Sequence, residues 1–252
     1  MKKRKAWVFI GIGIVSIFLV SLYLLNYSKP TSFPTHEQLV AEINSTFPEA
    51  DASDIQDTIS VDERHGLVPF ISTTDDYGLS YWIWEKNKWK VDTIDTNGVP
   101  TVWKVDRNNP SSYRIVWNVH PEDQVSSFQF YLKNDRNYLS LGGIETYTPG
   151  VLLKKKVSLN KNSYGLMKFP EEWVTFMNTS RKVESAKQPN MFFNDFSPNQ
   201  GISYHWISYD QDGNETFLDR SMNGIGSYSN GKIEMEFILN VNKGHIEDPS
   251  LH

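Results

Sequence analysis

The chain has 252 residues and no cysteine, so disulfide bonds are excluded and the fold must rest on packing and hydrogen bonds. Its formal net charge is −5, and because residues 1–26 carry four basic and no acidic side chains, the remainder carries −9. An acidic surface of this kind argues against nucleic acid as a ligand.

The first feature along the chain is an apolar run, Ala6–Leu25, which holds twenty residues without a charge. A helix of that length covers about 30 Å, the thickness of the hydrocarbon core of a bilayer. The run predicts a single-pass transmembrane signal-anchor helix whose partner is the lipid bilayer. Basic residues in the tail 1–5 favour a cytoplasmic N-terminus and an extracellular remainder; they are Lys2, Lys3, Arg4 and Lys5.

Two other structures fit this run less well. A cleaved signal peptide has a shorter apolar region and a small-x-small cleavage site, whereas bulky residues follow Ser21 here. A buried helix of a soluble protein does not explain the basic head at the chain end. Lysine outnumbers arginine in this cysteine-free chain, which favours a bacterial source and a domain facing the cell envelope.

Residues 26–34 are predicted to form a linker, because Pro30 and Pro34 stop the membrane helix from continuing into the domain. A helix is predicted over 35–47. Thr35 and Gln38 have the spacing of a capping box, and apolar residues follow at helical spacing until Pro48 ends the run. The apolar stripe of this helix is expected to cover a sheet.

The following residues mostly predict antiparallel strands. The strongest signal is a hairpin of aromatic strands, 79–85 and 89–94, joined by a short turn. The segment 66–72 contains Pro69, which predicts an edge strand at best. Further strands are expected to complete an extracytoplasmic α+β unit, residues 35–150; they are 99–105, 113–119, 127–133 and 138–141.

Residues 151–252 are predicted to form a second β-rich unit. Pro170 and two following acids mark a helix start, and strands are expected near 151–159, 201–210 and 233–241. Both units combine a Phe-Pro helix start, an aromatic strand and a strand ending in Asn-Val. One hypothesis is a diverged repeat; the alternative, shared hairpin vocabulary, fits the unequal spacing better. The fold class is α+β, with a β-sandwich carrying helices as the alternative.

The sequence contains no motif that selects a catalytic or metal site. The six histidines are scattered, and neither a GxSxG motif nor a cysteine nucleophile occurs. The stretch 210–215 resembles a calcium loop, but its glycine is misplaced for an EF-hand and a hairpin turn explains it. Turn formation and the helix dipole explain the acid pairs 75–76 and 171–172. We therefore predict no catalytic residue, no metal ligand and no cofactor.

Trp82 and Trp84 are the candidate binding residues. On a strand they project to one face, with Tyr81 and Ile83 on the other. An exposed aromatic platform for a sugar ring or a peptide is one interpretation. A central strand buried on both faces is the alternative, and it is favoured because core packing usually claims tryptophan.

The predicted function is a membrane-anchored, non-enzymatic binding module of the cell envelope. Its expected partner is an envelope protein or a cell-wall glycan. The anchor, the acidic ectodomain and the lack of catalytic motifs all favour this class. The alternative is a cell-envelope hydrolase acting on glycan or peptide, whose acids or Ser/His pair would converge only in the folded chain.

Overall fold

The computed structural model describes residues 11–18, 20, 29–141, 144–159, 162–187 and 201–246. Residues 11–18 and 20 are helical, and their aliphatic side chains are exposed. Among the described residues, no helix is both long enough and apolar enough to cross a membrane. The apolar run 6–25 is described only in part, and the basic tail 1–5 lies outside the described residues. The transmembrane helix therefore stays a prediction.

The predicted first helix is confirmed as α2, His36–Thr46. Both hydrogen bonds of the capping box form, since the Thr35 side chain accepts from the Gln38 N–H and the Gln38 side chain accepts from the Thr35 N–H. Leu39 and Ile43 are fully buried and pack with Val68, Phe70 and Trp82 of the strands that follow, so the apolar stripe covers a sheet as predicted.

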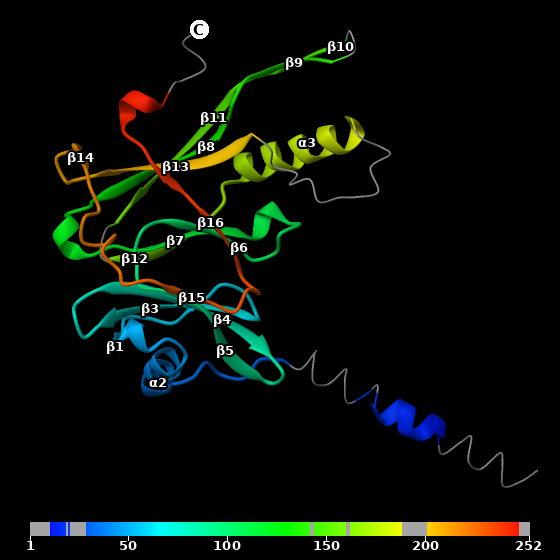
Figure 1. The fold of residues 1–252 in the computed structure, drawn as a ribbon, viewed down its shortest axis with the longest axis vertical. Helices are drawn as coiled ribbons and strands as arrows, with labels where there is room; N and C mark the ends of the chain where they lie inside the picture. The colour runs from blue at the N-terminus through cyan, green and yellow to red at the C-terminus, as the bar shows by residue number, and fades with distance from the viewer. Residues whose placement is uncertain are drawn as a thin grey trace, which may run out of the picture.

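The described strands form three stacked sheets, with α2 on the outer face of the first (Figure 1). Nearly all pairings are antiparallel, which confirms the α+β class with mainly antiparallel sheet. Sheet A contains β1 (Ala52–Ile55), β2 (Ile59–Ser60), β3 (His65–Ser72), β4 (Tyr77–Glu85), β5 (Lys88–Asp95) and β15 (Ser227–Ser229). Sheet B contains β12 (Tyr164–Lys168), β7 (Tyr113–Asn118), β6 (Thr101–Lys104) and β16 (Glu234–Phe237).

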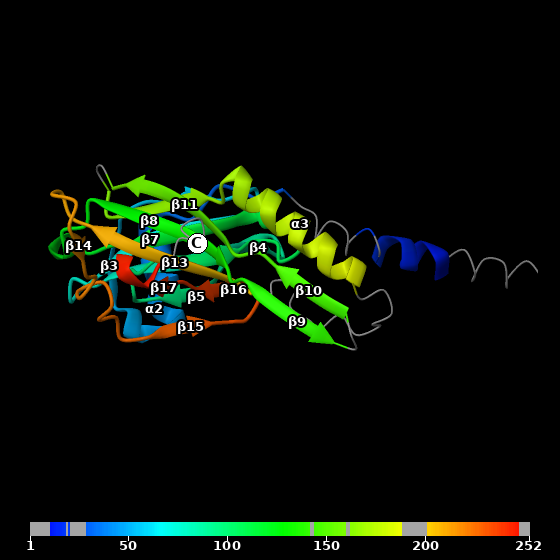
Figure 2. The ribbon, with the colours of Figure 1, turned by 90° about the horizontal axis from the view of Figure 1, so that it is seen from above.

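Sheet C is the third layer. It contains β11 (Val151–Ser158), β8 (Ser127–Asn134), β13 (Ile202–Tyr209), β14 (Glu215–Thr216) and β17 (Leu239–Asn240). A separate two-stranded arm extends beyond it (Figures 1 and 2), formed by β9 (Asn137–Leu141) and β10 (Ile144–Thr148). The predicted second helix is confirmed as α3, Glu171–Lys187, and its Trp173 and Met177 pack into the core between sheets B and C.

Short 3-10 turns connect several of these elements. They are η1 (Pro48–Ala50), η2 (Pro110–Ser112), η3 (Pro121–Asp123) and η4 (Lys243–His245). Each of the first three begins with a proline, whose fixed φ suits the first position of a helical turn.

The middle sheet is buried on both faces, because alternate side chains of its strands point to opposite neighbours. On β7, Ile115 and Trp117 belong to the core shared with sheet C, whereas Val116 belongs to the core shared with sheet A. Strand β6 divides in the same way between Val102 and Trp103. Every residue of β7 is buried as a result.

The hairpin of β4 and β5 is confirmed, with a two-residue turn at Lys86 and Asn87. Both residues have positive φ, 52° and 61°, as a type I′ turn requires. Trp82 faces α2 and Tyr81 faces sheet B. Strand β4 is therefore a central strand that is buried on both faces, which was the favoured interpretation of its aromatic pattern.

The edge position predicted for residues 66–72 is wrong. Strand β3 lies between β4 on one side and β1 and β2 on the other. The carbonyl of Pro69 accepts a hydrogen bond from the Gln56 N–H, so the side of Pro69 that lacks a donor faces the interruption between β1 and β2. No neighbouring strand needs the missing N–H there, which is why proline is tolerated inside the sheet.

The segment after β14 adds a strand to every sheet of the stack. Strand β15 pairs with β5, β16 with β6, and β17 with β13. Asp92, the extra residue at a β-bulge in β5, fastens this segment because its carboxylate accepts from the Ile233 N–H and its carbonyl accepts from the Asn230 N–H. Strands on either side of residue 150 thus pair within all three sheets. The diverged repeat stays a hypothesis beside its alternative, shared hairpin vocabulary.

Candidate functional site

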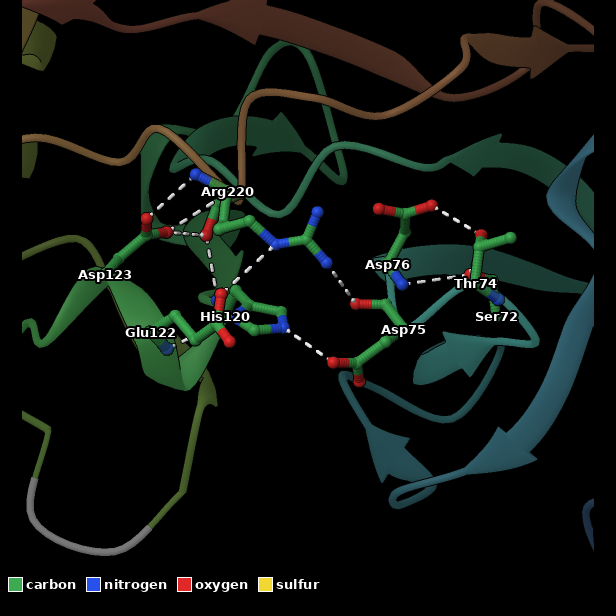
Figure 3. A network of polar contacts seen from close by, with 9 residues as sticks. Ser72, Thr74, Asp75, Asp76, His120, Glu122, Asp123 and Arg220 are labelled. Carbon is green, nitrogen blue, oxygen red and sulfur yellow. Dashed lines mark hydrogen bonds and ion pairs between the residues drawn. The ribbon is translucent and has the colours of Figure 1, made fainter.

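Three loops that are distant in sequence meet at one end of the stack (Figure 3). They are the turn between β3 and β4, the loop after β7 that includes η3, and the loop between β14 and β15. Their polar side chains form what we call the His120 cluster, defined by Asp75, His120, Glu122, Asp123, Arg220 and Ser221.

His120 is at the centre of the cluster and is 4% exposed. Its Nε2 lies 3.0 Å from Asp75 Oδ2, and its Nδ1 accepts a hydrogen bond from the Glu122 N–H at 3.1 Å. Because Nδ1 is an acceptor, the proton of the neutral ring sits on Nε2 and is donated to Asp75. The rings of Tyr77 and His120 pack in a T-shaped arrangement with 4.7 Å between their centroids.

Asp75 is held in place by its own turn. Its φ of 63° is in the left-handed region, which Asp tolerates better than most residues. Ser72, Thr74 and Asp76 brace the turn through hydrogen bonds among their side chains and to the Asp76 N–H. The Asp75 carboxylate is thereby directed at His120 (Figure 3).

Asp123 organises the loop between β14 and β15. Its carboxylate accepts from the N–H groups of Arg220 at 2.9 Å and Ser221 at 3.0 Å, and from the Ser221 hydroxyl. The Ser221 Oγ in turn accepts from the His120 backbone N–H at 2.8 Å. Three donors on one buried carboxylate give it the hydrogen bonds that burial of a charge requires.

Arg220 crosses the open side of the cluster. Its Nε lies 3.6 Å from Glu122 Oε2, and its Nη2 donates to the Asp75 carbonyl at 3.4 Å. The guanidinium therefore bridges the loop after β7 to the turn of sheet A (Figure 3).

The cluster holds a serine, a histidine and aspartates, but their contacts are not those of a nucleophilic triad. The Ser221 hydroxyl meets the backbone of His120 and the carboxylate of Asp123, whereas a triad needs the hydroxyl on a ring nitrogen. Both ring nitrogens are engaged elsewhere, and Ser221 is buried. The geometry is that of a clamp that fixes three loops.

A cleft of about 630 Å³ opens beside this clamp. It lies between the loop after β7, the segment before β12 and the β13–β14 turn. Its lining is rich in amides and carboxylates; it consists of Val119, His120, Pro121, Gln124, Val125, Leu159, Asn162, Ser163, Asp210, Gln211 and Asp212. No lysine or arginine is among these lining residues.

Among the described lining residues, the acidic side chains are Asp210 and Asp212. Hydrogen bonds from the backbone and side chain of Asn214 lower the pKa of Asp210, so this carboxylate is ionised at neutral pH. The same bonds, with the positive φ of Gly213, make the stretch 210–215 the hairpin turn that was predicted. Such a cleft suits a ligand that is neutral or cationic and rich in hydrogen-bonding groups.

An exposed aromatic platform, the less favoured interpretation of Trp82 and Trp84, is not available to a ligand in this structure. Trp82 is 1% exposed and Trp84 is 5% exposed. Trp82 packs against α2 and the ring of Phe33, and Trp84 packs edge-on against Trp89. The chain entering the domain supplies Phe33, and this covering layer is what the sequence pattern did not reveal.

Sequence reasoning missed His120, Asp123, Arg220 and the cleft. The run His-Pro-Glu-Asp at 120–123 follows a strand and carries the signal of a proline-led acidic turn. Nothing in the local sequence pairs it with residues 220–221, about a hundred positions away. Of the acid pairs considered from sequence, 75–76 enters the cluster and 171–172 opens α3.

Comparison with known proteins adds no further constraint, because no family model, curated protein or solved structure matches the chain.

Proposed function

We propose that this protein is a non-enzymatic binding module of the cell envelope, anchored in the cell membrane by residues 6–25 with the folded domain outside. The observation that carries the binding role is the cleft beside the His120 cluster. The loop after β7 belongs to both the clamp and the cleft, and it supplies His120 and Gln124 to the lining. The segment before β12 and the β13–β14 turn supply the other polar lining groups. Preformed concave sites with convergent polar groups are the usual form of ligand sites.

Support for the anchor comes from residues 11–18 and 20. They are helical, and their side chains Ile12, Ile14, Val15, Ile17 and Phe18 are exposed rather than packed on the domain. Exposed aliphatic side chains all round a helix are stable when lipid surrounds them.

The proposed ligand is a polar group of an envelope protein or of the cell-wall glycan. Amide and hydroxyl side chains such as Gln124, Asn162 and Ser163 match the hydroxyl and amide groups of both. Asp210 and Asp212 add an attraction for amino groups. A hydrolase of the Ser/His type requires a hydroxyl on an oriented ring, and the Ser221–His120 contact runs through the backbone instead. The Ser203 hydroxyl does lie 2.8 Å from His205 Nε2, but among the described residues His205 Nδ1 has no hydrogen-bond partner that would orient the ring.

The test is co-sedimentation of the full chain, in detergent micelles, with purified cell wall of the source organism. Asn162→Ala and Asp212→Asn remove lining groups from two different loops, and both positions are exposed. We expect the paired variant to lose binding while Asp219→Asn, an exposed acid outside the lining, binds like the wild type. Equal binding by all three proteins would reject the cleft as the binding site.

The anchor is tested separately by washing membranes at alkaline pH and by adding protease to intact cells. The full chain should stay with the membrane, and the protease should remove the folded domain. Release by the wash would contradict the anchor, and protection from the protease would contradict the orientation.

A further inference from the structure

The two ends of sheet A carry opposite charge. Strand β4 begins after Asp75 and Asp76 and ends at the turn that carries Lys86. Lys88 and Lys90 follow on β5, and Lys232 approaches from the segment before β16 to bind Glu85. Lys86 and Lys88 are exposed, and the described residues offer neither of them an ion pair. We call Lys86, Lys88, Lys90 and Lys232 the lysine end.

The chain enters the folded domain at this same end. The Trp89 Nε1–H donates to the Thr31 carbonyl at 3.1 Å, and the ring of Phe33 packs on Trp89 with 4.5 Å between centroids. Only residues 26–30 separate this contact from the apolar run 6–25. Five extended residues span at most about 17 Å, so the lysine end cannot lie far from the surface that the run enters.

We propose that the lysine end rests on the anionic phospholipid headgroups of that bilayer and so orients the domain. This inference rests on the membrane anchor proposed above. Charge complementarity selects the occupant, because Lys86 and Lys88 are exposed at the end of an acidic domain where its tether emerges. The exposed lysines of β11, Lys154 and Lys155, lie on sheet C and not at the tether. Basic residues close to a membrane are attracted to anionic lipid, each strengthening binding about fivefold.

Acidic neighbours set a limit on this attraction. Asp62 and Glu63 lie in the turn before β3, and the Trp84 N–H donates to the Arg64 carbonyl of the same turn. Asp62 is itself engaged by the His65 ring at 2.8 Å. Glu85 lies between Lys90 and Lys232 and is neutralised by them. The exposed lysines 86 and 88 therefore keep their charge for the membrane.

This orientation points the cleft away from the membrane. Nine residues of β4 cover about 27 Å, and the His120 cluster and cleft lie at the far end of that strand, beside Asp75. The acidic end is thereby held clear of anionic headgroups and faces the envelope, where a ligand of the proposed kind is found.

The experiment reconstitutes the full chain in vesicles of phosphatidylcholine alone, or of phosphatidylcholine and phosphatidylglycerol in equal parts. A membrane-impermeant amine reagent labels exposed lysines, and mass spectrometry gives the labelling rate at each. We expect Lys86 and Lys88 to react at least about fivefold more slowly in the anionic vesicles. Lys154 and Lys155, exposed on β11 of sheet C, are the internal control and should react equally in both.

Variants sharpen the result. Lys86→Gln with Lys88→Gln should restore fast labelling of Lys90 in anionic vesicles, whereas Lys154→Gln with Lys155→Gln should not. Equal labelling of Lys86 and Lys88 in the two vesicle types, with the protein still in the membrane after an alkaline wash, would overturn the lysine contact and leave the anchor standing. Loss of the protein in the wash would instead reject the anchor on which the inference rests.

Discussion

The His120 Nε2 lies 3.0 Å from Asp75 Oδ2, and this contact joins the loop after β7 of the middle sheet to a turn of sheet A. His120 is buried, whereas the side chain of Asp75 is 63% exposed. His120 and Asp75 should therefore contribute unequally to the stability of the fold. The ring fills space and receives the Glu122 N–H, while the carboxylate sits largely in water.

His120→Ala should lower the free energy of unfolding by about 1–2 kcal/mol. It removes the packing against Tyr77 and the acceptor for the Glu122 N–H. Asp75→Asn should cost less than about 1 kcal/mol, because a hydrogen bond to a largely solvated side chain contributes little and Asn keeps the tolerance for positive φ. Urea unfolding of both single variants and of the double variant gives the interaction free energy between the two side chains. A cost of Asp75→Asn equal to that of His120→Ala would contradict this division.

Asn118 of sheet B is linked to sheet A through its buried side-chain amide. Its Nδ2 donates to the carbonyls of Phe70 and Gly78 and to Gln56 Oε1, and its Oδ1 accepts from the Ser163 hydroxyl. Asn118→Ala should destabilise the protein by about 2–3 kcal/mol, since it leaves several buried polar groups unpaired. Asn108→Ala, in the exposed loop after β6, is the matched control and should change stability by less than about 0.5 kcal/mol. Chemical denaturation of the two variants decides the point.

Trp82 is expected to be a stability residue and not a binding residue. Trp82→Ala should cost about 3–5 kcal/mol, the usual range for a large aromatic side chain deleted from a core. Phe217→Ala removes an aromatic ring that is 67% exposed and should cost less than about 0.5 kcal/mol. Thermal unfolding compares them; a Trp82→Ala variant as stable as the wild type would argue that the ring is not part of the core.

Asp95 should make stability depend on pH in the opposite sense to most carboxylates. Burial raises its pKa, and the hydrogen bonds from Asn97 only partly oppose this. A raised pKa in the folded state means that stability is greatest below the unfolded pKa of about 4 and falls as pH rises through the folded value. Asp95→Asn keeps an acceptor oxygen and removes the charge.

The stability of Asp95→Asn relative to the wild type should therefore increase between about pH 3 and about pH 6. Urea unfolding at several pH values measures this difference. A difference that stays constant across the range, or that shrinks as pH rises, would show that the Asp95 carboxylate is not disfavoured by the fold.

Local signals predicted much of the secondary structure. The Thr35–Gln38 capping box and the alternation in β4 each depend on neighbours in sequence, and both were confirmed. The sequence of β4 shows that both of its faces are apolar, but it does not show which residues pack against each face. Phe33 and α2 supply one cover, and Trp103 of sheet B supplies the other.

The site depended on contacts that no local pattern contains. His120 meets Asp75 across 45 positions, and Asp123 meets Ser221 across 98. Pro69 shows the same limit in the fold, because its effect depends on whether a neighbouring strand needs its missing N–H. Pairings between distant segments decide such questions, and a single sequence does not record them.

The strands β15, β16 and β17 all come from residues 227–240, which the ribosome makes after the other strands of the three sheets. Until those residues emerge, β5 and β6 each expose an unpaired edge, the edge of β13 is paired only with β14, and Asp92 is buried without the Ile233 N–H that it accepts. The last strand of each sheet therefore comes from one short segment, and no sheet reaches its full width until that segment has been made.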